Sequence, residues 1–446
     1  MKETFRIRQR PPFYCGLILA TALCLWPGLS WAERLTLTVT PGQDLPDAAP
    51  GDGVCATSEG TCSLRAALDE ATAQQRPVYI TLASGSYPLR EPLEIAVDTI
   101  LEGAGAHAVT IETAPDFEGR RLLHYAEASR AWHKLQHLTV DAKGRSGGIR
   151  TAENVRLHLA DVVVRHGHAQ DDGGAIQAEG PLVLVRSSLV DNRADQGPGR
   201  GGAMVIHGAP AWITQTTLTG NQGGNSGGIF ARDAQVTLEH TTIVGNVGRP
   251  VGGYQQNPGS TLTIHGSWLG ETALPNGAVG LDCRSASRQE LGIDTGGFNV
   301  IAVTGPTGQV LVNEQWQDSW EFFCAFDDPT DQAGHRDAPL TGYWQRVTGP
   351  TGLIAVAAGP DHPAYRAIPD HACSPTDAWG RNNPPGEPCD AGALRAPEQA
   401  PRAEARPDEP SEADEPVDPI GARPTWVILI AVLLVAALIM LWWRRR

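Results

Sequence analysis

A pattern of apolar and polar positions repeats through the middle of the chain. Gly-Gly pairs begin at residues 147, 173, 201, 227 and 252, a spacing of 25 to 28 residues. Each pair precedes a short apolar stretch, a turn, an alternating stretch rich in β-branched residues and a polar turn. A fixed period of about 20 to 50 residues is the signature of stacked repeats, and short strands between turns indicate a β-solenoid. The pattern therefore predicts an all-β fold, a right-handed parallel β-helix of at least five repeats, because parallel crossovers are almost always right-handed.

Superposing the repeats predicts columns of equivalent side chains. A stacked asparagine bonds the amide of the next coil and tolerates the left-handed backbone of a tight corner. The polar corner column is expected to contain Asp141, His166, Asn192, Asn221 and Asn246. An apolar column of the core is expected to contain Leu138, Val163, Leu189, Leu218 and Ile243.

Both ends of the chain have the composition of membrane-directed segments. Residues 1–32 combine a basic start, an apolar stretch and Ser30-Trp31-Ala32, which predicts a secretory signal peptide, with an uncleaved anchor as the alternative. Residues 425–443 predict a transmembrane helix, and the Arg cluster at 444–446 predicts its cytoplasmic end. The Pro-rich, acidic stretch 395–424 predicts a solvated tether. Processing of this tail is the alternative to a retained anchor.

The remaining chain divides into three expected parts. Residues 33–115 are assigned to an N-terminal cap with the first coils, 116–275 to the β-helix repeats and 276–394 to a C-terminal cap. The formal net charge of −15 becomes −21 on residues 33–443, once the predicted signal (net +3) and the three terminal arginines are left out. Such an acidic chain argues against nucleic-acid binding, which needs basic stripes to neutralise phosphates.

Six of the eight cysteines lie in the part expected to be exported. An even number of cysteines outside the cytoplasm indicates disulfide bonds. Closeness in the sequence favours Cys55–Cys62, Cys283–Cys324 and Cys373–Cys389 among the many possible pairings. A zinc site is the alternative, although the chain contains no CxxC pair.

Two stretches resemble motifs of exported bacterial proteins. Residues 62–67 (CSLRAA), after Cys55, resemble the CSLREA motif that opens a family of exported bacterial β-helix proteins, with Ala66 where that family usually has glutamate. Residues 64–73 predict a short amphipathic helix that covers the edge of the first coil. Asp282-Cys283 and the segments 296–299, 373–381 and 389–393 are similar to the choice-of-anchor Q domain. The resemblance spans roughly residues 35–395 and implies a pectate-lyase-like β-helix whose C-terminus is anchored; a shared scaffold does not set the chemistry.

Polysaccharide cleavage is the activity to be considered first for such a fold. A calcium-dependent lyase needs carboxylates for the metal and a basic residue near the sugar, whereas a hydrolase needs two carboxylates. The candidate residues, from neighbouring coils, are Asp171, Asp172, Asp191, Asp195, Arg193 and Arg200. Ordinary turn chemistry of aspartate is the alternative that we favour.

Two further groups of residues are candidates for binding. His166, His168 and Asp171 have the ligand types for zinc or manganese, although His166 is equally explained as a corner residue. Arg186, Gln215, His240 and His265 occupy equivalent positions, and a ladder of them pointing outward from one sheet would line a shallow saccharide groove; a solvated sheet face is the alternative. Tryptophans suit stacking on sugars or packing in the end caps; the exported ones are Trp132, Trp212, Trp268, Trp316, Trp320, Trp344 and Trp379.

Together these observations predict a non-catalytic β-helix protein of the cell envelope. We expect it to be anchored to the inner membrane by its C-terminal helix, with a periplasmic or extracellular ectodomain that binds a polysaccharide or an envelope protein. No cofactor is expected. The alternative is a polysaccharide lyase or glycoside hydrolase that acts through Asp171, Asp172 and Asp195, and Ca²⁺ is implied only for the lyase.

Overall fold

The computed structural model describes residues 34–126, 132–194, 201–285, 293–304, 309–312, 315–318, 324, 326, 328–335 and 338–395. The expected signal peptide, the transmembrane segment, the Arg cluster and nearly all of the tether therefore lie outside the described residues. Within the ranges above, no helix has the length and the apolar character that a membrane crossing requires.

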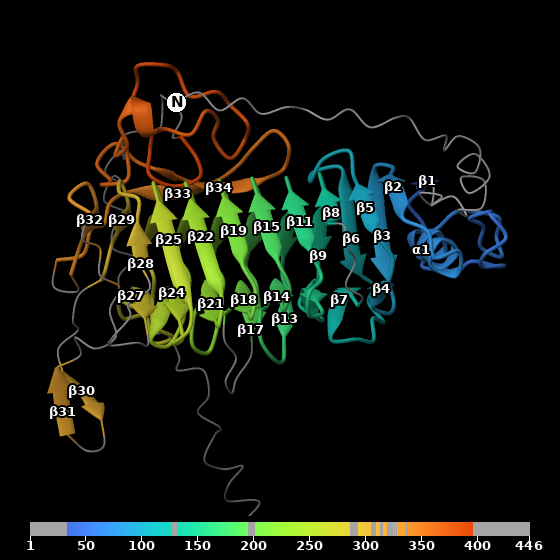
Figure 1. Ribbon diagram of the computed structural model, residues 1–446, viewed down its shortest axis with the longest axis horizontal. Helices are drawn as coiled ribbons and strands as arrows, with labels where there is room; N and C mark the ends of the chain where they lie inside the picture. The colour runs from blue at the N-terminus through green and yellow to red at the C-terminus, as the bar shows by residue number, and fades with distance from the viewer. Residues whose placement is uncertain are drawn as a thin grey trace, which may run out of the picture. The chain divides into compact units, whose positions relative to one another are not determined.

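Three parallel sheets, joined by short turns, wind into a right-handed β-solenoid (Figure 1). Sheet 1 consists of β1 (Leu35–Val39), β2 (Val78–Leu82), β5 (Thr99–Glu102), β8 (His133–Gln136), β11 (Leu157–Ala160), β15 (Leu182–Val185), β19 (Ala211–Thr214), β22 (Gln235–Glu239), β25 (Thr261–His265) and β28 (Ile293–Thr295). Sheet 2 consists of β3 (Gly85–Leu89), β6 (Val109–Thr113), β9 (Thr139–Asp141), β12 (Val163–Arg165), β16 (Ser188–Val190), β20 (Thr217–Thr219), β23 (Thr242–Val244), β26 (Trp268–Gly270), β29 (Val300–Ile301) and β32 (Gln332–Ala333). Sheet 3 consists of β4 (Leu93–Ile95), β7 (Arg121–Tyr125), β10 (Gly147–Thr151), β14 (Ile176–Ala178), β18 (Met204–His207), β21 (Ile229–Arg232), β24 (Val251–Gln256) and β27 (Leu281–Ser285).

The remaining elements are short. They are β13 (His168–Ala169), which pairs with β17 (Arg193–Ala194), the hairpins β30 (Gln309–Val312) with β31 (Gln315–Asp318) and β33 (Trp344–Thr348) with β34 (Ile354–Ala358), the helix α1 (Leu64–Ala73) and the 3₁₀ turn η2 (Asp370–Ala372). Strands of the solenoid continue to β32, so the boundary expected at residue 276 falls before the coils end.

The predicted amphipathic helix is confirmed as α1. Ser63 is its N-cap, since the Ser63 hydroxyl accepts a hydrogen bond from the Ala66 N–H at 3.0 Å. Its apolar face packs with Leu64 and Leu68 into the core beside β1 and β2. The three predicted disulfides, Cys55–Cys62, Cys283–Cys324 and Cys373–Cys389, are all present.

The asparagine column is confirmed for three of its five expected members. Asn221 Oδ1 accepts from both the backbone and the side-chain nitrogen of Asn192, and Asn246 Oδ1 does the same for Asn221, with all four distances between 2.9 and 3.0 Å. All three asparagines are buried. Asp141 and His166 do not belong to this column.

The error comes from the coil around residues 157–167. The register between β12 and β16 places Arg165 level with Val190, so His166 precedes the corner, and it is the Gly167 N–H that donates to Asn192 Oδ1 at 2.8 Å. The same shift makes Val163 wrong as a member of the apolar column, because Val164 is level with Leu189. Leu138 is likewise replaced by Val140.

The C-terminal segment, residues 338–395, folds back along the flank of the solenoid. Its hairpin β33–β34 contacts β16, β20 and β23 of sheet 2 through β34; Figure 1 shows β33 and β34 along the flank of the solenoid. The Ser188 hydroxyl donates to the Ile354 carbonyl at 2.6 Å. Sheet 2 is therefore covered, whereas Figure 1 shows no strand or loop of the described chain crossing the outer face of sheet 1.

Candidate functional site

The expected polar ladder lies at the corner between sheets 1 and 2, where the backbone adopts the left-handed conformation. Arg186, Gln215 and His240 are equivalent in successive coils, as predicted, and have φ values of 43°, 50° and 45°. His265 is not in this column, because it is level with Glu239, one position earlier. The polar character of the column therefore reflects a tight corner, and His137 and Asp161 continue it with φ values of 54° and 56°.

Two members of the ladder, Arg186 and Gln215, are bound to other protein groups. Arg186 forms a two-pronged ion pair with Asp161 at 2.9 and 2.6 Å. The Gln215 amide donates to the Ser374 hydroxyl at 2.8 Å and to the Thr376 carbonyl. At Gln215 the C-terminal segment occupies the position that a saccharide would take, so the ladder does not form one continuous saccharide groove.

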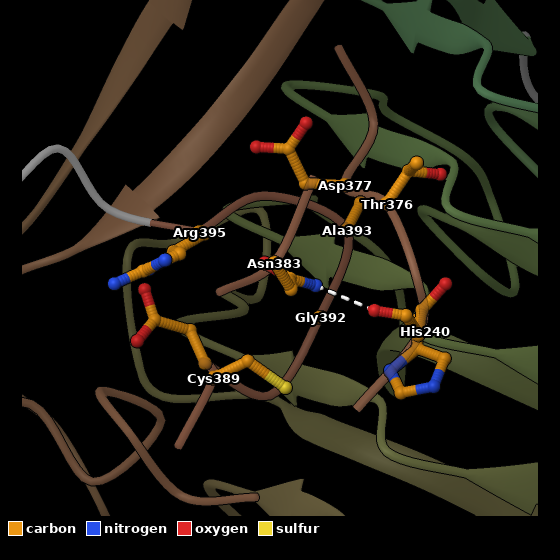
Figure 2. Close-up of a pocket in the computed structure, with 10 residues that line it drawn as sticks. His240, Thr376, Asp377, Asn383, Cys389, Gly392, Ala393 and Arg395 are labelled. Carbon is orange, nitrogen blue, oxygen red and sulfur yellow. Dashed lines mark hydrogen bonds between the residues drawn. The ribbon is translucent and has the colours of Figure 1, made fainter. Parts of the chain in front are cut away.

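His240 lies at the bottom of a pocket that the C-terminal segment closes (Figure 2). The pocket has about 220 Å³, part of it open to solvent. Figure 2 shows the Asp377 carboxylate turned away from the His240 ring; it accepts from the Arg381 side chain and backbone. Burial, with a smaller contribution from His265, lowers the pKa of His240 to about 4, so the ring is neutral at pH 7.

The walls of this pocket come largely from residues 374–395 of the C-terminal segment. Their backbone holds the C-terminal segment on the solenoid: the Gly392 N–H donates to the Gly266 carbonyl, and the Ala393 N–H to the Thr242 hydroxyl, both at 2.8 Å. The Cys373–Cys389 disulfide joins the two ends of the loop 374–388. These residues dock the C-terminal segment on the solenoid.

The expected catalytic carboxylates do not converge. Asp171 forms an ion pair with Arg121, whose guanidinium also donates to the carbonyls of Asp172 and Gly173. Arg121 is 5% exposed, and burial lowers its pKa although Asp171 opposes that effect. Asp171 thus balances a buried charge that joins two coils, and removing either partner would leave the other uncompensated.

The other members of the catalytic set lie elsewhere. Asp191 faces the C-terminal segment and pairs with Arg346 of β33 at 2.9 Å. Arg193 lies on β17, level with His168 of β13. Asp195 and Arg200 fall outside the described residues. Of the candidate carboxylates with described partners, Asp171 and Asp191 are thus each paired with a different arginine.

The expected metal ligands are not brought together either. His166 Nδ1 lies 2.9 Å from Asp141 Oδ1, and Arg165 pairs with the other oxygen of the same carboxylate at 2.8 Å. The pKa of Asp141 is lowered to about 2, since the hydrogen bonds from His166 and Lys143 outweigh its burial. Nowhere in the described ranges do three His, Cys, Asp or Glu side chains gather as metal ligands do. A site built from His166, His168 and Asp171 is therefore wrong.

A different surface is left open on sheet 1. Trp212, on β19, is 43% exposed, although tryptophan is usually well covered. Val183, Trp212 and Thr237 are level in consecutive strands, and Thr263 continues the row on β25. The inward neighbours Ala211 and Ile213 are fully buried. The β19 strand is therefore anchored in the core while it presents an indole ring to solvent.

The sequence indicates that Trp212 faces outward, but it does not show that the sheet around it stays uncovered. Alternation in AWIT predicts that Trp212 is opposite to Ile213, yet only the path of the C-terminal segment shows which sheet stays open. No known protein family, curated protein or solved structure matches the chain. The fold and this surface define an all-β, right-handed parallel β-solenoid protein with one covered flank and one open face.

Proposed function

We propose that the chain is an exported, membrane-tethered protein of the cell envelope that binds a glycan, without cleaving it, on the open face of sheet 1. The observation that carries the proposal is the exposed indole of Trp212 in a row of side chains on a flat sheet. Three disulfides within the described residues support an oxidising compartment.

The chemistry of the face suits a saccharide. A sugar ring presents apolar C–H groups on its faces and hydroxyls at its rim, so it pairs with an aromatic ring flanked by polar side chains. Next to Trp212 stand Thr237 in the same row and Thr214 two residues further along β19, both half-buried. Adjacent strands are about 4.8 Å apart, so an extended glycan along the solenoid axis meets a new side chain at each coil.

The test is binding of the purified full chain to an array of neutral and acidic polysaccharides. Trp212→Ala is expected to weaken binding at least about tenfold, which corresponds to about 1.4 kcal/mol. Trp212→Phe, which keeps a smaller ring, is expected to retain part of the affinity. Tyr343→Ala removes a ring of similar exposure (37%) from the C-terminal segment and is expected to change nothing.

Turnover is measured on the same polysaccharides, with and without calcium. Release of new sugar ends by the wild-type chain would refute the non-catalytic assignment and favour the lyase or hydrolase alternative. Binding that survives Trp212→Ala, or no binding to any glycan, would refute the proposed site.

A further inference from the structure

A second surface feature lies at the edge between sheets 2 and 3, away from the row of Trp212. It is a pocket of about 250 Å³, part of it open to solvent. Its lining includes Arg120, Arg145, Ser146, His168, Gln170 and Asp171. This is the edge at which the sequence predicted carboxylates for a calcium-dependent reaction.

The charges of the pocket are opposite to those that calcium requires. Among the described residues that line it, Asp171 is the one carboxylate, and it is already paired with the buried guanidinium of Arg121. Arg120 and Arg145 are exposed, and neither has an ion-pair partner among the described residues. Glu118 and Asp172, which adjoin lining residues in the sequence, do not line the pocket. Among the described residues, the guanidiniums of Arg120 and Arg145 therefore remain to meet a ligand.

Backbone hydrogen bonds fix the main chain from which these side chains extend. The Gly147 N–H donates to the Arg120 carbonyl at 2.9 Å, and the His168 N–H donates to the Ser146 carbonyl at 2.7 Å. The Arg145 N–H donates to the Ala142 carbonyl at 2.9 Å. Bonds between neighbouring coils and one local turn thus fix the main chain at Arg120, Arg145, Ser146 and His168, which reduces the ordering cost of binding.

We propose that this pocket binds the anionic group of an acidic saccharide, a carboxylate or a sulfate ester, directly through Arg120 and Arg145. Guanidinium groups match the paired oxygens of such anions, and the charge strengthens the hydrogen bonds. The formal net charge of the chain is −15, so a pocket with unpaired arginines is a local exception. The site does not depend on the Trp212 face, and the anion is held without a bridging metal.

The experiment measures equilibrium binding of the purified full chain to four probes. These are an oligosaccharide of galacturonic acid, a sulfated oligosaccharide, a neutral galactose oligosaccharide of the same length, and inorganic phosphate. The wild-type chain is expected to bind an acidic oligosaccharide in the presence of EDTA and to lose affinity as salt is raised. Arg120→Ala and Arg145→Ala are each expected to weaken that binding about fivefold or more, and together to reduce it to the level of the neutral probe.

Two controls separate this site from alternatives. Arg232→Ala removes an exposed arginine from β21, on the same sheet as the pocket edge, and is expected to leave binding unchanged. Trp212→Ala is expected to retain binding of the acidic probe, so failure of one proposal is distinguishable from failure of the other. Since both pocket arginines are exposed, their variants are expected to unfold at the wild-type temperature.

Three results would overturn the proposal. The first is binding of the acidic oligosaccharides that persists in the double variant, and the second is binding that EDTA abolishes. The third is binding of inorganic phosphate as tight as that of the oligosaccharides, which would assign the pocket to a free anion.

Discussion

Asp282, in the last strand of sheet 3, is a fully buried carboxylate whose replacement by asparagine is expected to stabilise the protein at neutral pH. Asp282 Oδ1 accepts from the Thr272 hydroxyl and Oδ2 from the Val303 N–H, both at 2.6 Å. Burial nevertheless dominates and raises the pKa of Asp282 from 3.8 to about 7, with nearby Glu271 adding to the rise. The folded state therefore binds a proton more tightly than the unfolded chain.

The sign and size of the effect follow from this pKa. The folded protein gains stability because it binds the Asp282 proton more tightly than the unfolded chain does. This stabilisation is fully present below about pH 4 and is lost as pH rises to about 7. A shift of about three pKa units corresponds to about 4 kcal/mol, as an order of magnitude. Asp282→Asn keeps the shape: its amide oxygen accepts from Val303, and its nitrogen donates to Thr272, whose hydroxyl also reaches the Leu281 carbonyl at 3.2 Å.

The assay is denaturant unfolding of both proteins, followed by tryptophan fluorescence at intervals from pH 4 to pH 8. The difference in free energy of unfolding, Asp282→Asn minus wild type, is expected to increase with pH by about 4 kcal/mol and to level off above pH 7. Asp294→Asn, which replaces an exposed carboxylate on β28, serves as the control and is expected to show no such trend. A difference that stays flat, or falls as pH rises, would refute the reasoning.

Three further substitutions test the packing of the coils and of the segment on their flank. Asn221→Ala removes two accepted and two donated hydrogen bonds in a buried ladder and is expected to lower the free energy of unfolding by about 3 kcal/mol, measured by denaturant titration. A Cβ on Gly147 would lie 2.5 Å from an Arg121 guanidinium nitrogen, so Gly147→Ala is expected to cost about 2 kcal/mol, and less in an Arg121→Met background, which a double-mutant cycle measures. Gln215→Ala removes the amide that holds Ser374, and limited proteolysis is expected to cut residues 338–395 faster than in the wild-type chain.

The repeat, the cap and the disulfides were predictable because each depends on residues close in sequence. The helix α1 begins at Ser63 and buries the face that its apolar spacing indicates. The register of the coil at residues 162–164 was harder to predict. Its three consecutive valines fit both the expected alignment, with Val163 level with Leu189, and the observed one, with Val164 there. Asn192 and Asn221 mark a corner without ambiguity, whereas His166 near the corner does not.

The covered flank was not predictable from the repeats. It depends on contacts between distant parts of the chain, such as Ser188 with Ile354, which are 166 residues apart. The sequence of residues 338–395 has no period that reveals which sheet it covers. Val163 illustrates the consequence: its side chain points away from the coil interior, yet it is 1% exposed because it packs against Leu353 of that segment.

A polar side chain in a solenoid is therefore best tested first for a structural role, such as a tight turn or a buried ion pair, before any chemistry is assigned to it. Arg186 and His240 stand where the chain turns through a left-handed conformation, and Asp171 balances a buried arginine, so each has a structural cause. Trp212 has none, because a threonine or valine would pair equally well at its place in β19 and expose less apolar surface. The unpaired arginine Arg145 contributes no ion pair to the fold in the described part of the chain. The residues that stability does not explain, and not the most polar ones, mark the surfaces where a ligand is expected.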